Sequence, residues 1–281
     1  MKSQFSIILF ASLILWSCKN EAPIPVPPAP PELYFHLSRT RTNQNPDIDQ
    51  QSQRLNLDQF DMTLLGGDMA YLSSKDDETM AYLDSIFDLD APETLWALGN
   101  HDYSNLTRIS QFTDRPIFYS SHHQGITFVV LDTQDSLSNI IGAQREMLDM
   151  VLDTIDRSSH LVLLHHKLIW MHQHPVMDAM LDSVTNGHRG NCFFCLNPNN
   201  FQTDLYPQLQ AVQARGIQVI CLGGDIGSRV KSFQYIDNDG IVFLASGVDF
   251  ADSDNVGIVF THQIAERRLD WEFVPLDQLT E

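Results

Sequence analysis

Apolar residues recur along the chain in short runs whose length and spacing predict alternating strands and helices. Six runs rich in aliphatic and β-branched side chains predict buried strands. Helical periodicity links some of these runs, with one apolar stripe in each segment. The strands are expected at 33–37, 62–65, 94–98, 126–131, 160–164 and 217–222, and the helices at 76–87 and 142–156.

The pattern changes after residue 222. Alternating runs at 230–236 and 241–245 flank the turn sequence Asp-Asn-Asp-Gly, and further runs follow at 257–260 and 269–274. This is typical of a hairpin and a meander. Crossover units followed by antiparallel strands predict an α/β fold in which mixed sheets pack between helices.

One stretch fits neither pattern. The segment 169–202 is long and rich in Asn and Gly, and it is interrupted by Pro175 and Pro198. Loops of this length are usually functional or mobile.

The amino terminus has the features of an export signal. Lys2 precedes an apolar run that is too short to span a membrane comfortably and that ends at Leu-Trp-Ser-Cys, with Cys18 as the last residue. This resembles a bacterial lipobox, although Trp16 is unusual there, and an ordinary secretory signal is the alternative. A proline-rich spacer follows, which would hold a domain away from a membrane. We therefore expect a signal peptide over 1–17, a lipidated Cys18 and linker over 18–32, and one domain over 33–281, anchored in the cell envelope as an outer-membrane lipoprotein.

Charge narrows the expected partners. The 281 residues include 36 acidic and 17 basic side chains, for a formal net charge of −19. Phosphate contacts with nucleic acid need clustered Lys and Arg, so we expect no nucleic-acid partner. We expect a membrane contact only through the anchor, with an outer-membrane protein complex as a candidate partner.

Polar side chains follow four of the predicted strands where each strand ends. Asp68 comes after Gly-Gly, Asn100-His101-Asp102 after Gly, His165-His166 after an apolar run, and Asp225 after Gly-Gly. The carboxyl ends of strands in an open α/β sheet converge on one crevice, so these groups are expected to meet. Together they offer oxygen and imidazole ligands for a divalent metal.

In this order the motifs resemble those of the calcineurin-like metallophosphoesterases. Gly67-Asp68 is similar to that family's second motif, and Gly99-Asn100-His101-Asp102 matches the third completely. The segment from 126 to His166 is similar to the one leading to the fourth. The resemblance implies a layered αββα sandwich of two mixed sheets, and a site where two metals clamp a phosphate while a hydroxide attacks phosphorus.

The first and fifth family motifs are not retained. Arg39-Thr40-Arg41 stands where Asp-x-His belongs, although reading Tyr34-Phe35-His36 there would recover one histidine inside the strand. Gly224-Asp225-Ile226-Gly227 replaces Gly-His-x-His. When the family's metal ligands are assigned to this sequence residue by residue, those that bind only the first metal are missing, because their positions hold Arg39, Arg41 and Gly227. Arginines cannot ligate a cation and would repel one.

The residues that still match the family's ligand positions, or replace them by another ligand, would hold only one metal ion. We expect at most one divalent metal, Mn²⁺ or Zn²⁺, at Asp68, Asn100, His165 and Asp225, or none. His101 would donate a proton to the leaving oxygen, with Asp102 orienting it. A variant that combines Arg39→Asp, Arg41→His and Gly227→His would contain the missing ligands, and we expect it to regain metal affinity.

Three functions remain open on these residues. A one-metal phosphoester hydrolase would use Arg39 and Arg41, with His166 as a further contact, to bind phosphate. A non-catalytic protein would bind a phosphorylated or sulfated ligand at the same place. In a metal-free scaffold, a pseudophosphoesterase, the arginines would neutralise Asp68 and Asp225.

The remaining cysteines and histidines give weaker signals. Cys192 and Cys195 are expected to form a short disulfide in an exported protein, with half a zinc site including His188 as the alternative. Cys221 is expected in the core. His172 and His174 are candidates for the pocket rim, and His122-His123 is interpreted as a hairpin connection.

Overall fold

The computed structural model of the protein describes residues 30–280. The signal peptide, Cys18 and nearly all of the proline-rich linker predicted from the sequence lie outside the described residues. Among residues 30–280, no helix is both long and apolar enough to cross a membrane.

A five-stranded sheet contains the first three strands and the last two. Its order is β11-β10-β1-β2-β3, with β1 (Glu32–Leu37), β2 (Met62–Leu65) and β3 (Thr94–Trp96) parallel to one another. The long strands β10 (Val256–Gln263) and β11 (Arg268–Pro275) continue it as an antiparallel pair. The sheet is therefore mixed.

A six-stranded sheet holds the middle of the chain, in the order β4-β5-β6-β7-β9-β8. Its four central strands are parallel and its two edge strands are antiparallel to their neighbours. The strands are β4 (Tyr119–His123), β5 (Ile126–Val130), β6 (His160–His165), β7 (Gln218–Gly223), β8 (Ser232–Ile236) and β9 (Val242–Ser246).

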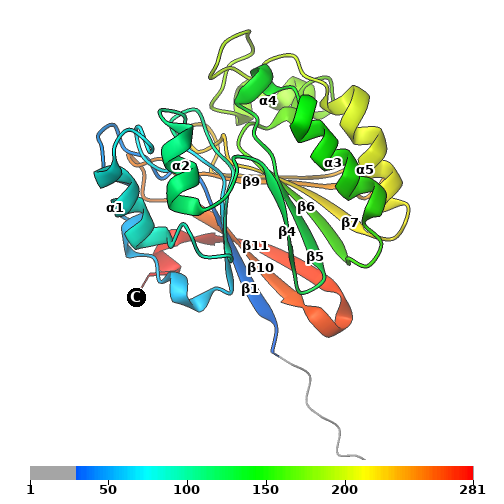
Figure 1. Ribbon diagram of the computed structural model, residues 1–281, viewed down its shortest axis with the longest axis horizontal. Helices are drawn as coiled ribbons and strands as arrows, with labels where there is room; N and C mark the ends of the chain where they lie inside the picture. Colours follow the sequence, from blue (N-terminus) through cyan, green and yellow to red (C-terminus); the bar gives the residue numbers. More distant parts are fainter. Residues whose placement is uncertain (1–29, 281) are drawn as a thin grey trace, which may run out of the picture.

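The two sheets pack face to face and helices cover both outer faces (Figure 1). Helices α1 (Asp77–Phe87) and α2 (Leu106–Thr113) lie over the five-stranded sheet. Helices α3 (Gly142–Thr154), α4 (Leu181–Val184) and α5 (Tyr206–Gln213) lie over the six-stranded sheet. Three buried apolar clusters fill the two helix–sheet layers and the space between the sheets. The predicted layered αββα sandwich of two mixed sheets is confirmed.

Most predicted elements are present within one or two residues of their expected ends, but three features differ. Strand β4 and helices α2 and α5 were not predicted. His122 and His123 lie in β4 itself rather than in the connection, which is the turn at Gln124 and Gly125. The stretch 169–202 is not a bare loop, because it contains α4 and buries Trp170, Met171 and other side chains in the core beside α3 and α5.

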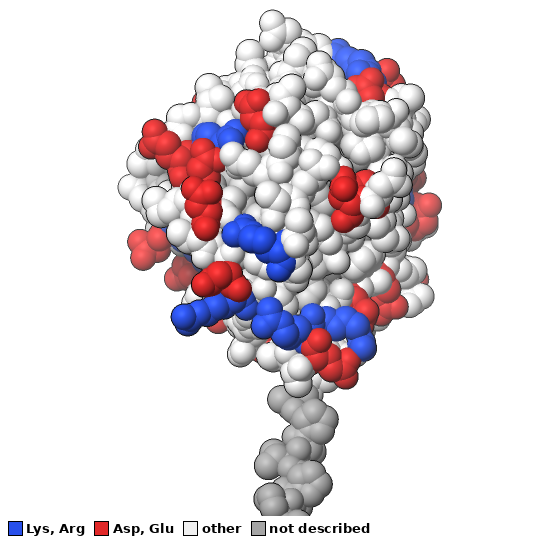
Figure 2. Space-filling model, turned by 90° about the vertical axis from the view of Figure 1, so that its right-hand side faces the viewer, with Lys and Arg blue, Asp and Glu red and all other residues white. Residues whose placement is uncertain are grey.

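Charges on the surface are mixed. On the face shown in Figure 2, basic side chains occur in small groups that stand beside acidic ones. This distribution suits a protein with about twice as many acidic as basic residues.

Candidate functional site

The polar groups that follow the strands meet in one cavity of about 450 Å³ at the carboxyl ends of both sheets. From the five-stranded sheet come the segments after β1, β2 and β3, and from the six-stranded sheet the segment after β7. The loop before α5 closes one side. The lining residues are Arg39, Arg41, Asp68, Asn100, His101, Asn186, Gly187, His188, Phe194, Asp225 and Ser228.

The turns after β2 and β3 contact each other because each contains a glycine, Gly67 and Gly99, at the point of closest approach. A Cβ at Gly99 would lie 2.2 Å from the Asp68 Oδ1 atom, and a Cβ at Gly67 would lie 2.5 Å from the Gly99 backbone nitrogen. Gly67 and Asp68 both adopt positive φ, at 91° and 59°. Glycine therefore lets the two turns approach closely, and this contact places the Asp68 carboxylate beside His101.

Asp102 holds both turns in place by accepting hydrogen bonds from their backbone N–H groups. Its side chain is fully buried, and its oxygens accept hydrogen bonds from the backbone N–H groups of Asp68 (2.7 Å), Gly99 (2.7 Å) and Met69 (3.1 Å). The Ser73 hydroxyl also donates to it. Burial and the neighbouring Asp68 charge raise the pKa of Asp102.

His101 is oriented by a different group from the one expected. Its Nδ1 atom lies 2.6 Å from the Tyr71 carbonyl oxygen, so Nδ1 carries the proton and donates it there. The orienting role expected of Asp102 is therefore wrong: the oxygens of Asp102 are bound to the two turns. The ring of His101 stays partly exposed at the cavity, and its backbone N–H donates to Asp68 Oδ1 at 3.0 Å.

Of the two histidines after β6, His166 reaches the carboxylates and His165 does not. The Nε2 atom of His166 lies 3.6 Å from Asp68 Oδ1 and 3.9 Å from Asp225 Oδ1. His166 is fully buried, Nδ1 donates to the Gly66 carbonyl, and Nε2 has no hydrogen-bond partner. His165 instead packs edge-on against Trp170, and burial lowers its pKa to about 3. The structure therefore places His166, predicted as a phosphate contact, where we expected His165.

The two carboxylates differ in their electrostatic surroundings. Although burial alone would raise the pKa of Asp68, the nearby His166, His101 and Arg41 hold it below its usual value. Burial raises the pKa of Asp225, and Asp68 adds to that effect.

Arg39 and Arg41 both enter the cavity. Arg39 is 8% exposed and adopts a positive φ, its Nη1 donates to the Val248 carbonyl at 2.7 Å, and it lies 3.7 Å from Asp249. The Nε atom of Arg41 lies 3.7 Å from Asp68 Oδ2 but has no hydrogen-bond partner. Burial and the charge of Arg41 lower the pKa of Arg39.

The glycine of the altered fifth motif has no room for a side chain. Gly227 has a φ of 128°, and a Cβ there would lie 2.5 Å from the Val248 carbonyl oxygen. A histidine therefore fits at this position only if the backbone moves. The expectation that Gly227→His helps to restore a metal site is wrong for this backbone.

The cavity holds oxygen and imidazole donors suited to a divalent ion, although Asp68, His166 and Asp225 as a set are spaced more widely than 4.8 Å. The buried, unpartnered Nε2 of His166 between two carboxylates is the arrangement of a ligand set, and its distances to those oxygens approach the spacing of atoms that share an ion. Asp68, His166 and Asp225 would hold it, with Asn100 nearby in the cavity. The guanidinium groups of Arg39 and Arg41 line the same cavity. Among the described residues, the only three acidic, His or Cys side chains with ligand atoms all within 4.8 Å of one another are Asp84, Asp88 and Asp90, on the surface after α1.

The loop of residues 186–194 contributes side chains that were not predicted as part of this site. Asn186, His188 and Phe194 line the cavity, together with Ser228. The structure joins Cys192 to Cys195 by a disulfide in this loop, and Cys221 is a buried free thiol. The only sequence signal for these residues was the unusual length of the segment. His172 borders a separate cavity beside the same loop, and His174 is buried against Tyr235 and Phe243, so neither lines this site.

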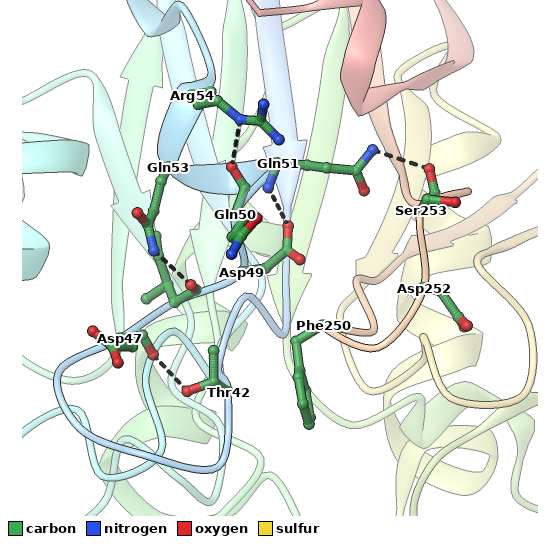
Figure 3. Close-up of a pocket in the computed structure, with 11 residues that line it drawn as sticks. Thr42, Asp47, Asp49, Gln50, Gln51, Gln53, Arg54, Phe250, Asp252 and Ser253 are labelled. Atoms are coloured by element: carbon green, nitrogen blue, oxygen red, sulfur yellow. Dashed lines mark hydrogen bonds between the residues drawn. The ribbon is translucent and has the colours of Figure 1, made fainter.

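A third cavity, of about 790 Å³, lies beside the segment after β1 and is lined mainly by amides and carboxylates, with Phe250 (Figure 3). Its polar groups are largely bound to one another: Gln51 Nε2 donates to the Ser253 carbonyl at 3.0 Å, and Arg54 Nε to the Gln50 carbonyl at 3.0 Å. It lacks the converging unpaired groups that mark the first cavity.

Comparison with known proteins identifies the fold. No protein-family model and no curated protein sequence matches the chain. Among solved structures, a dimetal phosphatase from Danio rerio is similar with a TM-score of 0.55 at 14% identity, covering 88% of this chain and 97% of that one.

Two larger proteins align less well. A 5'-nucleotidase precursor from Thermus thermophilus has a TM-score of 0.45 at 10% identity over 89% of this chain, and a NAD nucleotidase from Haemophilus influenzae has 0.40 at 10% over 87%. The chain spans 55% and 50% of their lengths. The two mixed sheets, their flanking helices and the match over nearly the whole phosphatase show that this chain has the calcineurin-like metallophosphoesterase fold.

Proposed function

We propose that this protein binds phosphoesters in the cavity between Arg41 and Asp225 and hydrolyses them with one divalent ion. One observation carries the proposal. His166 Nε2 and Arg41 Nε, two nitrogen atoms beside Asp68, are buried without a hydrogen-bond partner, as are Asn186 Nδ2 in the same cavity and His165 Nε2. A buried polar atom without a partner is costly, which is explained if a ligand supplies the missing contact.

The two unpaired atoms beside Asp68 differ in what they can bind. His166 Nε2 stands between the carboxylates of Asp68 and Asp225, so it suits a cation. Arg41 Nε is a cationic donor facing the same cavity, so it suits an anionic oxygen. A metal ion with a phosphate on it satisfies both, and such an ion polarises the phosphoryl oxygens.

The remaining lining groups have roles consistent with phosphoester cleavage. Arg41 orients the phosphate through a charge-assisted hydrogen bond, and Arg39 adds positive charge from the side of Asp249. Because the Tyr71 carbonyl holds the Nδ1 proton of His101, a protonated His101 presents its second proton, on Nε2, for the leaving oxygen.

Turnover and metal content of the purified protein test this proposal. We expect one Mn²⁺ or Zn²⁺ per chain, and hydrolysis of p-nitrophenyl phosphate or bis-p-nitrophenyl phosphate. His166→Ala should abolish metal binding. His101→Ala should bind metal normally but lose about 10²- to 10⁴-fold in kcat, the usual contribution of a general acid. His122→Ala, on the exposed strand β4, is the matched control. Two metals per chain, or no phosphoester turnover with metal present, would refute it.

A metal-free binding protein is the second candidate, and the ion pairs favour it. Arg41 with Asp68 and Arg39 with Asp249 already balance charge in the cavity without any ion. Absence of metal and of turnover, with phosphate binding retained, would establish this alternative.

We also propose that the protein is a lipoprotein of the cell envelope, anchored at Cys18. The apolar run that ends at Cys18 and the proline spacer behind it support this. Cys18→Ser should release the protein from membranes or block its processing. Membrane fractionation identical to the wild type would contradict the anchor.

A further inference from the structure

Two phenylalanines stand exposed on a four-residue disulfide loop at the mouth of the candidate site. Phe194 is 58% exposed and Phe193 is 41% exposed. Large aromatic side chains exposed beside a polar cavity often mark a binding surface. Phe194 itself lines the cavity with Arg39, Arg41 and His101.

The loop that carries them is held rigidly. The disulfide Cys192–Cys195 closes it, and Asn197 bonds both backbone groups of Cys192, each at 2.9 Å. The backbone N–H of Leu196 donates to the His188 carbonyl at 2.9 Å.

Beneath the loop lies a buried lysine. Lys167 is fully buried, and its ammonium group donates to the Phe193 carbonyl at 2.7 Å and to Ser138 Oγ at 3.4 Å. Phe193 also packs edge-on against Tyr103, with ring centroids 5.4 Å apart. A buried cation, a disulfide and an aromatic contact together hold the backbone of this loop beside the cavity that Phe194 lines.

We propose that Phe194 is the specificity-determining residue of the site and stacks on a flat aromatic group attached to the phosphate. This inference rests on the proposed phosphoester function, and it names the substrate class as an aryl-type phosphoester rather than a small alkyl one. A phenylalanine side chain has only two torsions to order on binding, so it loses little conformational entropy, and aromatic stacking tolerates many ring types. Phe194 contributes the apolar surface of a cavity whose other lining side chains are polar or charged.

Binding of phosphonates to the purified full chain in Mn²⁺ buffer tests the inference without interference from hydrolysis. 1-Naphthylmethylphosphonate and methylphosphonate share the phosphonate group, lack the P–O bond to a leaving group, and differ in the ring. We expect the naphthyl compound to bind about tenfold more tightly, as judged by Kd from calorimetry, the lower range of what stacking supplies. Phe194→Ala should bring the ratio of the two Kd values close to one while leaving the Kd of methylphosphonate unchanged.

Two further variants sharpen the result. Phe194→Leu keeps an apolar side chain without a ring, and should lose most of the ratio. Phe250→Ala removes a phenylalanine of comparable exposure, 38%, from the third cavity (Figure 3) and should keep the full ratio.

The outcomes separate this inference from the proposed function. If methylphosphonate binds and the naphthyl compound binds no more tightly, the stacking role is wrong and the phosphate site stands. If Phe194→Ala leaves the ratio of the two Kd values unchanged, the naphthyl ring is recognised by other residues and the inference also fails. If neither phosphonate nor inorganic phosphate binds, the proposed function fails and the inference falls with it.

Discussion

Replacing Asp102 with alanine should destabilise the whole domain, because this carboxylate holds the two turns that form the site. It is fully buried and accepts four hydrogen bonds, three of them from backbone N–H groups of Asp68, Met69 and Gly99. The alanine variant leaves these donors buried without a partner.

The magnitude follows from the number of donors. An unsatisfied buried donor costs about 1–3 kcal/mol, and bonds to a charged acceptor contribute about 1.5–3 kcal/mol each. These contributions are not additive, and the rise in the pKa of Asp102 on burial shows that its charge is itself costly. We therefore expect Asp102→Ala to lower the free energy of unfolding by about 4 kcal/mol, which is about 10 °C in Tm for a domain of this size.

Urea unfolding followed by circular dichroism measures this loss, and Asp49→Ala is the matched control. Asp49 is 4% exposed and accepts hydrogen bonds from the backbone N–H groups of Gln51 and Ser52, and from the Ser52 hydroxyl, away from the site. Both variants should lose stability, but only Asp102→Ala should also weaken metal binding, because it releases the turn that carries Asp68. An Asp102→Ala protein that unfolds at the wild-type urea concentration would refute the bracing role. So would an Asp49→Ala variant that loses metal affinity equally.

Three further predictions concern the rest of the molecule. Gly227→Ala should cost about 2–4 kcal/mol in urea unfolding, because φ is 128° and the new Cβ would meet the Val248 carbonyl; wild-type stability would show that the loop relaxes freely. Burial, with help from His262 and Arg267, lowers the pKa of His160 to about 4, so the folded state resists protonation while the unfolded state titrates near 6.5. Stability from this group is present above pH 6.5 and lost as the pH falls towards 4; between pH 7.5 and 4.5 the wild type should lose roughly 2–3 kcal/mol more than His160→Gln, and His122→Gln should match the wild type. Under denaturing, non-reducing conditions a thiol reagent should label Cys221 but not Cys192 or Cys195, and labelling of all three would exclude the disulfide.

The sequence predicts the buried central strands better than the exposed edge strand β4, because only the buried strands have a strong apolar signal. Buried strands such as β2 (Met-Thr-Leu-Leu) and β7 (Gln-Val-Ile-Cys-Leu-Gly) are short, mostly apolar runs followed by glycine, and their length and flanking glycines favour strands over helices. Strand β4 has the sequence Tyr-Ser-Ser-His-His, is half exposed at the sheet edge, and carries no such signal. Its position comes from pairing with β5, a contact that the sequence does not encode locally.

The site was predicted at the level of loops but not of individual atoms. The convergence of the turns after β2, β3 and β7 follows from the rule that strand ends meet at one edge. The choice between His165 and His166 does not, because an apolar run from 161 to 164 has no alternation to show which face the next residue occupies. In the structure His165 is the last residue of β6 and faces Trp170, so His166, the first residue past the strand, turns towards Asp68.

Arg39 and Gly227, the two positions where we expected different residues from the motif resemblance, lie against the same backbone carbonyl. Arg39 donates to the Val248 carbonyl at 2.7 Å, and the missing side chain at Gly227 would meet that same carbonyl oxygen at 2.5 Å. The segment after β9 therefore occupies the space beside both altered motifs, and a cationic side chain and a glycine each fit against it. A side chain at Gly227 needs Val248 to move, whereas Arg39→Asp would only remove the donor that now binds the Val248 carbonyl. On the opposite side of the cavity, Asp68, His101 and His166 keep contacts that do not involve this segment. Asp225 lies two residues before Gly227, and its carboxylate is 3.9 Å from His166 Nε2, so the segment after β7 takes part both in the proposed ligand set and in the contact with Val248.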